Sequence, residues 1–476
     1  MRIDRRLFLA GLGSVAAGCA SQRAPKFADA LQDARCDDEW KQAENNKTQT
    51  QIPQFPKRDV LITDFGARAD GATDATDAIA EAIAACHQSG GGRVVVPAGT
   101  FFTGPIHLLS NVNLHIVRGG TLKFSTEPER YLPAVFTRWE GMEFMGYSPL
   151  VYAYEQTNVG LTGEGTLDGQ ASMANWWPWK GGDEWFKQGS PTQDKARDAL
   201  MRDVASGVPP GERHYAQGAY LRPPFVQFYR CRNILIEDVR VLRSPFWLLN
   251  PVLCQHVTVR NVRLESLGPN SDGCNPESCS HVVIENCYFD TGDDCIAIKS
   301  GRNADGRRLA VPSENILITG CKMLAGHGGV VIGSEISGGC RNVFVENCHM
   351  SSPDLERGIR IKTNSIRGGL IENLRVRNLV IGRVRDAVVI NFYYEEGDVG
   401  GFDPVVRNIR IENLLCQHAD RVFQVRGFDR AKIHDLVLEN VFFVEAKDFG
   451  VIENVKNLKL ENVNINGERV QFSGKK

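Results

Sequence analysis

The sequence of 476 residues lacks any appreciable net charge, and its most apolar run is too short to cross a bilayer. Lys and Arg number 55 against 57 Asp and Glu, a formal net charge of −2, so no global positive field exists to attract nucleic acid and no nucleic-acid partner is expected. The apolar run near the N-terminus ends at Ala17, short of a membrane-spanning length. Since 42% of the residues are hydrophobic and 24% charged, disordered, collagenous and multi-span membrane proteins are excluded.

The N-terminus predicts export. Residues 1–18 have the form of a signal peptide, and the run 5–9 (Arg-Arg-Leu-Phe-Leu) resembles the twin-arginine export signature. The following Cys19 completes a sequence that resembles a bacterial lipobox, although Ala16 stands where Leu is usual. We expect a lipid on Cys19, the only membrane contact predicted; the alternative is simple cleavage and a soluble periplasmic protein. Residues 19–56 are polar and predict a tether. Together with the signal peptide and Cys19, this predicts a protein of the periplasm or a lipoprotein anchored in the outer membrane.

One short pattern organises most of the chain: Asn, aliphatic, any, aliphatic, any, Asn. Its copies recur every 22 to 35 residues and alternate apolar with polar positions, which is the period of a strand. No long amphipathic helix separates them, so a doubly wound sheet is excluded, and propeller blades would need longer periods. The pattern predicts an all-β, single-stranded, right-handed parallel β-helix, a solenoid that occupies residues 57–476 as one domain. The copies begin at Asn233, His256, His281, Asn315, Asn342, Asn373, Asn408, Asp435 and Asn457.

Three further features fit a solenoid. The second Asn of each copy forms a column that we expect at a coil corner, where Asn tolerates left-handed geometry. Cys287, Cys321 and Cys348 share one repeat position and are expected to be inward, reduced thiols; a line of single ligands does not make a tetrahedral zinc site. Residues 74–87 have helical apolar spacing and predict an N-terminal helix that caps the first coil.

Polar motifs interrupt four consecutive coils. They are Asn270-Ser-Asp-Gly, Gly292-Asp-Asp, Gly326-His-Gly and Arg360-Ile-Lys, and their key residues lie 12 to 20 residues after the start of their coil. Because these distances are similar, all four motifs can fall on one side of the solenoid. Adjacent coils are ~4.8 Å apart, so the motifs span the length of a sugar-binding cleft. Crowded carboxylates raise one another's proton affinity and can supply a general acid, and the neighbouring cations suit a substrate that carries its own carboxylate.

With these motifs the sequence resembles glycoside hydrolase family 28, the polygalacturonases, from about Asp59 to the C-terminal coils. Asn270-Ser-Asp-Gly stands where the family usually has Asn-Thr-Asp-Gly. The resemblance implies an inverting hydrolase without metal or cofactor, acting on pectic polysaccharide or oligogalacturonides, and we expect a monomer. It implies Asp293 as general acid, Asp272 and Asp294 as the residues that activate water, His327 as the residue that orients or tunes the acid, and Asn270, Arg360, Lys362 and Tyr394 as substrate-binding residues, with Tyr393 as an alternative to Tyr394.

The coil that starts at 281 is 34 residues long, and its excess lies in the basic segment 300–311. This loop, with Arg302, Arg307 and Arg308, is expected to close one end of the cleft and hold a chain terminus, which predicts exo action. The segment also looks like the exo-acting bacterial branch of the family. Three tryptophans are interpreted either as a wall of the same pocket or as loop core: Trp176, Trp177 and Trp179.

Three alternatives stay open. A rhamnogalacturonan or xylogalacturonan hydrolase of the same family is the nearest. A pectate lyase shares the β-helix, but it needs Ca²⁺, which an aspartate cluster could bind, and leaves an unsaturated product. A non-catalytic adhesin would release no reducing ends.

Overall fold

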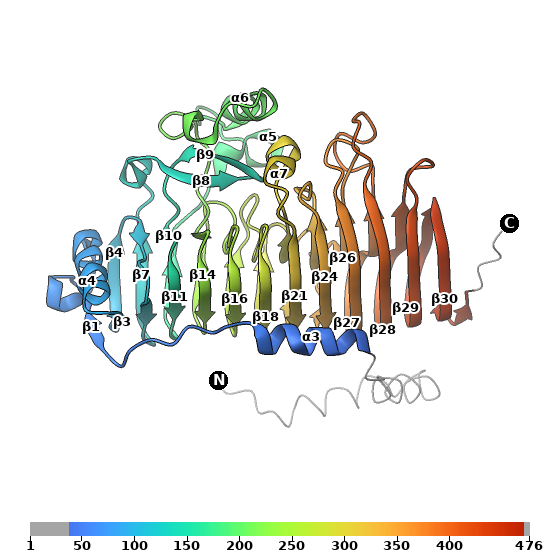
Figure 1. Ribbon diagram of the computed structural model, residues 1–476, viewed down its shortest axis with the longest axis horizontal. Helices are drawn as coiled ribbons and strands as arrows, with labels where there is room; N and C mark the ends of the chain where they lie inside the picture. The colour runs from blue at the N-terminus through green and yellow to red at the C-terminus, as the bar shows by residue number, and fades with distance from the viewer. Residues whose placement is uncertain (1–37, 471–476) are drawn as a thin grey trace.

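The computed structural model describes residues 38–470, which form an elongated stack of coils (Figure 1). Strands pair in parallel with their equivalents in the next coil, so the stack carries three long parallel sheets. The predicted all-β, parallel β-helix architecture is therefore confirmed.

Sheet 1 contains β1 (Asp59–Leu61), β3 (Gly92–Val96), β6 (Val112–Ile116), β11 (Thr157–Thr162), β14 (Arg232–Glu237), β16 (Gln255–Arg260), β18 (Ser280–Glu285), β21 (Ser313–Thr319) and β24 (Cys340–Glu346). Sheet 2 contains β2 (Asp70–Asp74), β4 (Gly99–Thr103), β7 (Gly120–Phe124), β12 (Thr166–Asp168), β15 (Arg240–Leu242), β17 (Arg263–Ser266), β19 (Tyr288–Thr291), β22 (Lys322–Met323) and β25 (His349–Met350). Sheet 3 contains β5 (Ile106–His107), β10 (Val151–Tyr154), β13 (Val226–Tyr229), β20 (Ile296–Ile298), β23 (Val330–Gly333) and β26 (Arg357–Lys362).

The last coils are built from longer strands. β27 (Leu370–Asn391), β28 (Val405–Arg426) and β29 (Ile433–Glu453) each have 21 or 22 residues, and β27 pairs in turn with β24, β25 and β26. The stack ends with β30 (Val455–Ile465) and the short antiparallel β31 (Glu468–Arg469). One strand thus continues through all three sheets, which keeps the late coils in register with the earlier ones.

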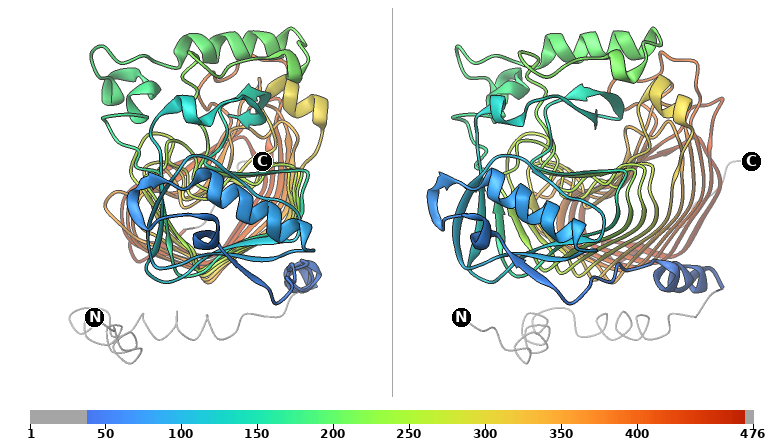
Figure 2. Two further views of the ribbon diagram at one scale, coloured as in Figure 1. Left: turned by 90° about the vertical axis from the view of Figure 1, so that its left-hand side faces the viewer. Right: turned by 60° about the vertical axis from the view of Figure 1, so that its left-hand side comes forward.

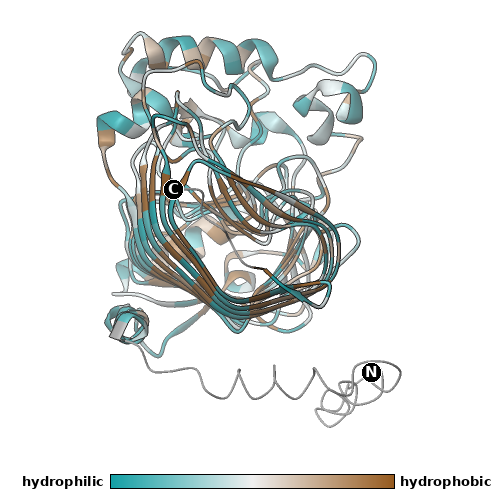
Figure 3. Ribbon diagram, turned by 90° about the vertical axis from the view of Figure 1, so that its right-hand side faces the viewer, coloured by the Kyte–Doolittle hydropathy of each residue, from teal (hydrophilic) through white to brown (hydrophobic). Residues whose placement is uncertain are grey.

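The repeat pattern places the core inside the coils. Val257, Val282 and Ile316 occupy one register position in successive coils, and all three are fully buried. Viewed along the axis, apolar residues follow the inner path of the coils (Figure 3). Cys321 lies between Cys287 and Cys348 in this interior, and the eleven cysteines within residues 38–470 are buried and free. The cysteines therefore serve as small apolar side chains of the core.

The corner asparagines adopt the conformation expected of them. Asn378, Asn413, Asn440 and Asn462 all have positive φ, between 52° and 54°. Each donates a side-chain amide hydrogen bond to the residue one coil back, as in the 2.8 Å bond from Asn462 to Asn440. The column therefore fixes the corner of each coil and links successive coils.

The first coil is capped as predicted. α4 (Thr76–Gln88) buries Ile79, Ala82, Ile83 and Cys86 against the stack, beside η1 (Ile62–Phe65). Figure 2 shows this helix lying across the open end of the solenoid. It covers the apolar interior that the first coil would otherwise expose.

The expected tether over residues 19–56 is wrong for its C-terminal part. α3 (Asp38–Gln49) lies along sheet 1 (Figure 1), and its Trp40 packs on Leu317 and Phe344 with 4% of its surface exposed. Leu317 and Phe344 are apolar residues at outward positions of their strands, and α3 covers them. The helix looks like a tether in sequence because only one narrow face of it is apolar.

The signal peptide, Cys19 and the rest of the tether up to residue 37 lie outside the described residues. Among residues 38–470, no helix is both long and apolar enough to cross a membrane.

A second layer covers one side of the stack beside sheet 3. We call residues 128–146 and 172–212 the canopy; Figures 1 and 2 show it above the coils. Its elements are η2 (Pro128–Tyr131), β8 (Val135–Trp139), β9 (Met142–Gly146), η3 (Trp177–Lys180), α5 (Gly182–Trp185), α6 (Asp194–Ala205) and η4 (Pro210–Glu212). The canopy has its own apolar cluster, in which Trp139 stacks on Phe246.

Candidate active site

The structure brings the four polar motifs together under the canopy. Asp272 follows β17, Asp293 and Asp294 follow β19, and His327 lies between β22 and β23. One oxygen of each of the three aspartates lies within 4.8 Å of one oxygen of the others. A Cβ on Gly292 would lie 2.3 Å from the carbonyl oxygen of Gly268, so only glycine lets the Asp293 coil approach its neighbour this closely.

Asp294 forms the base of the cluster. Its side chain is completely buried, although the resemblance implies that it activates water. The Nζ of Lys362 donates a 2.7 Å hydrogen bond to Oδ2 of Asp294, and a guanidinium nitrogen of Arg360 lies 3.5 Å from Oδ1. The aromatic ring of Tyr394 covers both cations, with ring centroid distances of 5.2 and 5.3 Å. The two cations compensate the negative charge of the buried carboxylate.

Asp272 is the carboxyl group of the cluster whose pKa is raised. Its burial, and next the charge of Asp293, raise its pKa well above the ordinary value. Asn275 donates a 2.8 Å hydrogen bond to its Oδ2, and the Nζ of Lys299 lies 3.7 Å from the same oxygen. Lys299 is itself bound to Glu335, 2.8 Å away. Asp272 is therefore held rigidly at the floor.

Asp293 and His327 form a second proton-binding unit. The Nδ1 of His327 and Oδ1 of Asp293 are 3.0 Å apart, and this hydrogen bond, together with the carboxylate charge, raises the pKa of His327 to about 9. Burial alone would raise the pKa of Asp293, but the imidazolium, Lys362 and Lys299 more than offset it and hold that pKa below its usual range. At neutral pH the unit is an imidazolium and a carboxylate that share one proton.

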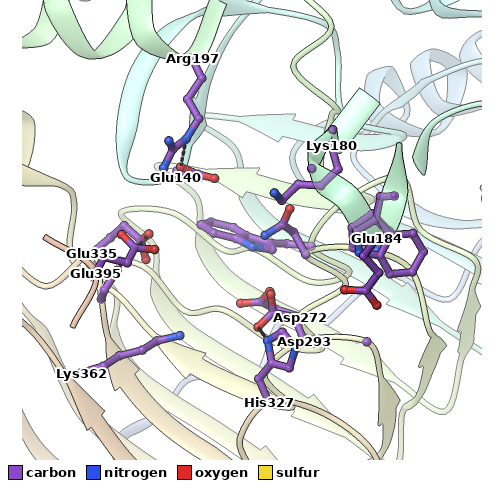
Figure 4. Close-up of a pocket in the computed structure, with 18 of the residues that line it drawn as sticks. Glu140, Lys180, Glu184, Arg197, Asp272, Asp293, His327, Glu335, Lys362 and Glu395 are labelled. Carbon is purple, nitrogen blue, oxygen red and sulfur yellow. Dashed lines mark hydrogen bonds and ion pairs between the residues drawn. The ribbon is translucent and has the colours of Figure 1, made fainter. Parts of the chain in front are cut away.

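These groups line a cavity of ≈ 400 Å³ (Figure 4). Its floor contains Asn270, Asp272, Asp293 and His327, and the canopy forms the opposite wall. The cavity-lining residues from the canopy are Glu140, Lys180, Gly181, Gly182, Asp183, Glu184, Trp185 and Arg197. The volume is that of a small-molecule site rather than a long open groove.

The structure corrects the expected closure by the basic loop. Residues Asn303–Leu309 form the short helix α7 beside the canopy, and only Arg302 lines the cavity, where it binds Glu140 at 2.8 Å. Arg307 donates to the main-chain oxygen atoms of residues 366 and 367, and Arg308 binds Asp305 and Glu143. These two arginines consolidate the packing of α7 and do not reach the cavity.

Other expected site residues are placed as follows. Tyr394 lines the cavity, whereas Tyr393 packs on Phe428. Asn270 lines it and accepts a 2.7 Å hydrogen bond from Arg222. None of the three tryptophans at 176, 177 and 179 lines it: the first and last are buried in the core, and the indole of Trp177 donates to the carbonyl of Ser244. The alternative interpretation as loop core is therefore the right one.

Sequence reasoning missed the whole canopy wall and two ion-paired floor residues, Lys299 and Glu335. The canopy segments lie outside the repeat, so no periodic pattern marks them. The sequence does contain a signal that could have identified Lys299, because this lysine directly follows the apolar run Ile296–Ile298. A charged residue at that point of a buried strand needs a partner, and Glu335 supplies it.

The aspartate cluster has the composition of a cation site, but its surroundings do not fit one. Divalent cations require oxygen ligands with free negative charge. Here Lys362 and Arg360 already neutralise Asp294, and Lys299 and His327 flank the other two carboxyls. The arrangement therefore suits proton transfer better than cation binding.

Comparisons with known proteins agree with this geometry. The family described as "Glycosyl hydrolases family 28" matches residues 211–460, and "Rhamnogalacturonase A/epimerase, pectate lyase-like" matches residues 59–115. The solved structure of a hyperthermoactive exopolygalacturonase from Thermotoga maritima is 44% identical with a TM-score of 0.85, over 91% of this chain and 97% of that one. The probable polygalacturonase of Vitis vinifera is 26% identical over 80% of this chain and 73% of its own length. The exo-poly-alpha-D-galacturonosidase of Dickeya chrysanthemi is 26% identical over 75% of this chain and 60% of its own.

The match to the family spans more than half of the chain, and it includes all four polar motifs that the structure gathers at the cavity. This chain is a glycoside hydrolase and belongs to glycosyl hydrolase family 28.

Proposed function

We propose that the protein is an exo-acting polygalacturonase that hydrolyses the α-1,4-galacturonosidic bonds of pectic homogalacturonan and releases single units from a chain end. The observation that carries this proposal is the position of the aspartate cluster on the floor of a cavity whose opposite wall is the canopy. A polymer needs an open groove on both sides of the cleaved bond, whereas a walled cavity accepts a terminus. The similarity to exo-acting relatives supports the same activity.

In this proposal Asp293 is the general acid. It is the most exposed carboxyl of the cluster, with 16% of its side chain accessible against 3% for Asp272 and none for Asp294. The proton that the imidazolium of His327 shares with this carboxylate can pass through Asp293, which faces the cavity, to the glycosidic oxygen. Asp272, which lines the cavity, orients the attacking water, and the buried Asp294 fixes the position of Lys362. Arg360, Lys362 and Tyr394 bind the galacturonate on their side of the cleaved bond.

The stereochemistry follows from how the water is held. A water activated by Asp272 attacks the face opposite the leaving group, so an α-linked substrate gives a β-product first. The oxygens here lie within 4.8 Å of one another, closer than the ~6.5–9.5 Å common between inverting carboxyls and nearer the ~5–5.5 Å of retaining ones. The anomer of the first product is therefore a direct test of the assigned roles.

The test is product analysis with oligogalacturonides of defined length, in buffer containing EDTA. We expect monogalacturonate from the first minutes, little loss of polymer viscosity, and a β-anomer in early NMR spectra. A spread of mid-sized oligomers would refute exo action and leave the hydrolase in place. An unsaturated, ultraviolet-absorbing product, or activity that EDTA removes and Ca²⁺ restores, would point to a lyase. If the enzyme releases sugars faster from rhamnogalacturonan or xylogalacturonan than from oligogalacturonides, those polymers become the assigned substrates.

We propose further that the protein acts as a monomer exported through residues 1–18 and anchored by a lipid on Cys19. Mass spectrometry of the mature N-terminus tests this, because a diacylated cysteine and a simple cleavage near Ala17 give different masses.

A further inference from the structure

One cation of the cavity has no carboxylate partner. Arg197 and Arg302 bind Glu140, at 3.1 and 2.8 Å, Lys299 binds Glu335 at 2.8 Å, and Lys362 binds Asp294 at 2.7 Å. Lys180, the last residue of η3, is half-buried and lines the same cavity. Within residues 38–470 no carboxylate forms an ion pair with its ammonium group. Its exposed neighbours Asp183 and Glu184 lie on the same wall, where ion pairs in solvent contribute little.

Lys180 and Lys362 lie on different sides of the aspartate cluster. In Figure 4, Lys362 lies to the left of Asp272 and Asp293, and Lys180 lies above them, on the canopy. The canopy segment that carries Lys180 is anchored over earlier coils, because Trp177 binds Ser244, just after β15, and packs against Gly268, just after β17. Lys362 belongs to β26, two coils beyond the strand that follows Asp293 and Asp294.

A glycosidic bond between two galacturonates has one carboxylate on each side. In the proposed function Lys362, which lines the cavity, meets one of these sugars, so the other sugar needs a separate cation. Lys180 is the available one, and it is carried by the wall that ends the cavity. It also lies in residues 116–210, which neither family match covers, so it is not part of the shared catalytic core.

We propose that Lys180 binds the C6 carboxylate of the chain-terminal galacturonate and makes the protein select a uronate over neutral galactose at the chain end. This inference rests on the proposed function, since it concerns the same cavity. It assigns specificity to the canopy and leaves the chemistry to the four polar motifs. A lysine ammonium that meets a carboxylate in a partly desolvated wall forms a charge-assisted hydrogen bond, which a neutral C6 hydroxymethyl group cannot replace.

The experiment uses 4-nitrophenyl α-D-galacturonide, in which only the terminal sugar carries a carboxylate. We expect Lys180→Met to lower kcat/KM by about 10- to 100-fold, the range for a hydrogen bond to a charged group. The loss should fall mainly on KM, because the interaction does not involve the reacting atoms. Lys180→Arg should retain more activity than Lys180→Met, and Lys180→Gln provides a second neutral variant. Lys187→Met is the matched control, since Lys187 is exposed on the same segment and does not line the cavity.

A binding measurement separates this inference from the proposed function. Calorimetry with D-galacturonate and D-galactose requires no turnover. Lys180→Met should weaken galacturonate binding by the same factor and leave galactose binding unchanged. If the wild-type protein binds galacturonate through Lys180 but hydrolyses no oligogalacturonide, the proposed function fails and this inference stands. If the enzyme is active and Lys180→Met equals Lys187→Met with galacturonide and galacturonate, the inference is overturned.

Discussion

His327→Gln tests the idea that one proton is shared between His327 and Asp293. Contact with the carboxylate raises the pKa of His327 from 6.5 to about 9. Taken in full, this shift corresponds to about 3 kcal/mol, but 49% of the imidazole is exposed, so solvent screening reduces the interaction to about 1–2 kcal/mol. In the wild-type protein the proton therefore stays on the pair above the ordinary imidazole pKa, and the alkaline limb of kcat/KM should lie between pH 6.5 and about 9.

Without the imidazole, Asp293 has to hold the proton alone. Removing the cation raises the pKa of Asp293, but a carboxyl without this partner stays far below 9. We expect the alkaline limb of His327→Gln to move down by two units or more, with a matching loss of activity at neutral pH. The assay is the pH dependence of kcat/KM with a short oligogalacturonide. His349→Gln is the control, because His349 is exposed on β25 and lies outside the cavity.

The same contact has a defined effect on stability. A group whose folded pKa is raised contributes its full stabilisation below the unfolded pKa of 6.5, and this is lost as the pH rises through about 9. The difference in unfolding free energy between the wild type and His327→Gln should therefore be about 1–2 kcal/mol at pH 6 and vanish by pH 10. An unchanged alkaline limb in His327→Gln, or an imidazole that titrates at its ordinary pKa by NMR, would refute the reasoning.

Two further predictions concern the acid and the N-terminal helix. Asp293→Asn should lower hydrolysis by ~10²-fold or more, because an amide cannot donate the acid proton. Folding and galacturonate binding should persist, which calorimetry checks. Near wild-type turnover in the kinetic assay would contradict the assignment. Activity of this variant should recover with a 4-nitrophenyl leaving group, which needs no protonation, whereas Asp272→Asn should stay inactive. Trp40→Ala removes the packing on Phe344 and the Arg377 contact at 3.8 Å, so we expect a loss of about 3–5 kcal/mol in docking of α3, seen as faster hydrogen exchange in residues 38–49. Its kcat should stay close to wild type, and unchanged exchange would show that Trp40 does not hold the helix.

Much of the fold could be predicted from the sequence because a solenoid is held together by neighbouring repeats. The two-residue alternation decides which side chains point inward, and the recurring asparagines mark the corners, so the register from Val257 to Val282 to Ile316 follows from the pattern alone. The four polar motifs follow their strands at similar distances, so stacking the coils brings them together. For these residues a local pattern and the tertiary structure contain the same information.

The sequence by itself therefore determined the β-helix, its cap and the residues of the aspartate cluster. Only the tertiary structure decided that Asp294 is buried beneath Asp293, that Arg307 and Arg308 turn away from the cavity, and that Lys180 faces it. The physical reason is that the segments around the coils, such as the canopy, α7 and α3, are held by contacts without a period. The ion pair between Arg213 and Asp305 joins residues 92 positions apart, and the indole of Trp40 reaches Glu412 across 372. Such contacts depend on how whole segments pack, and no repeat in the sequence predicts them.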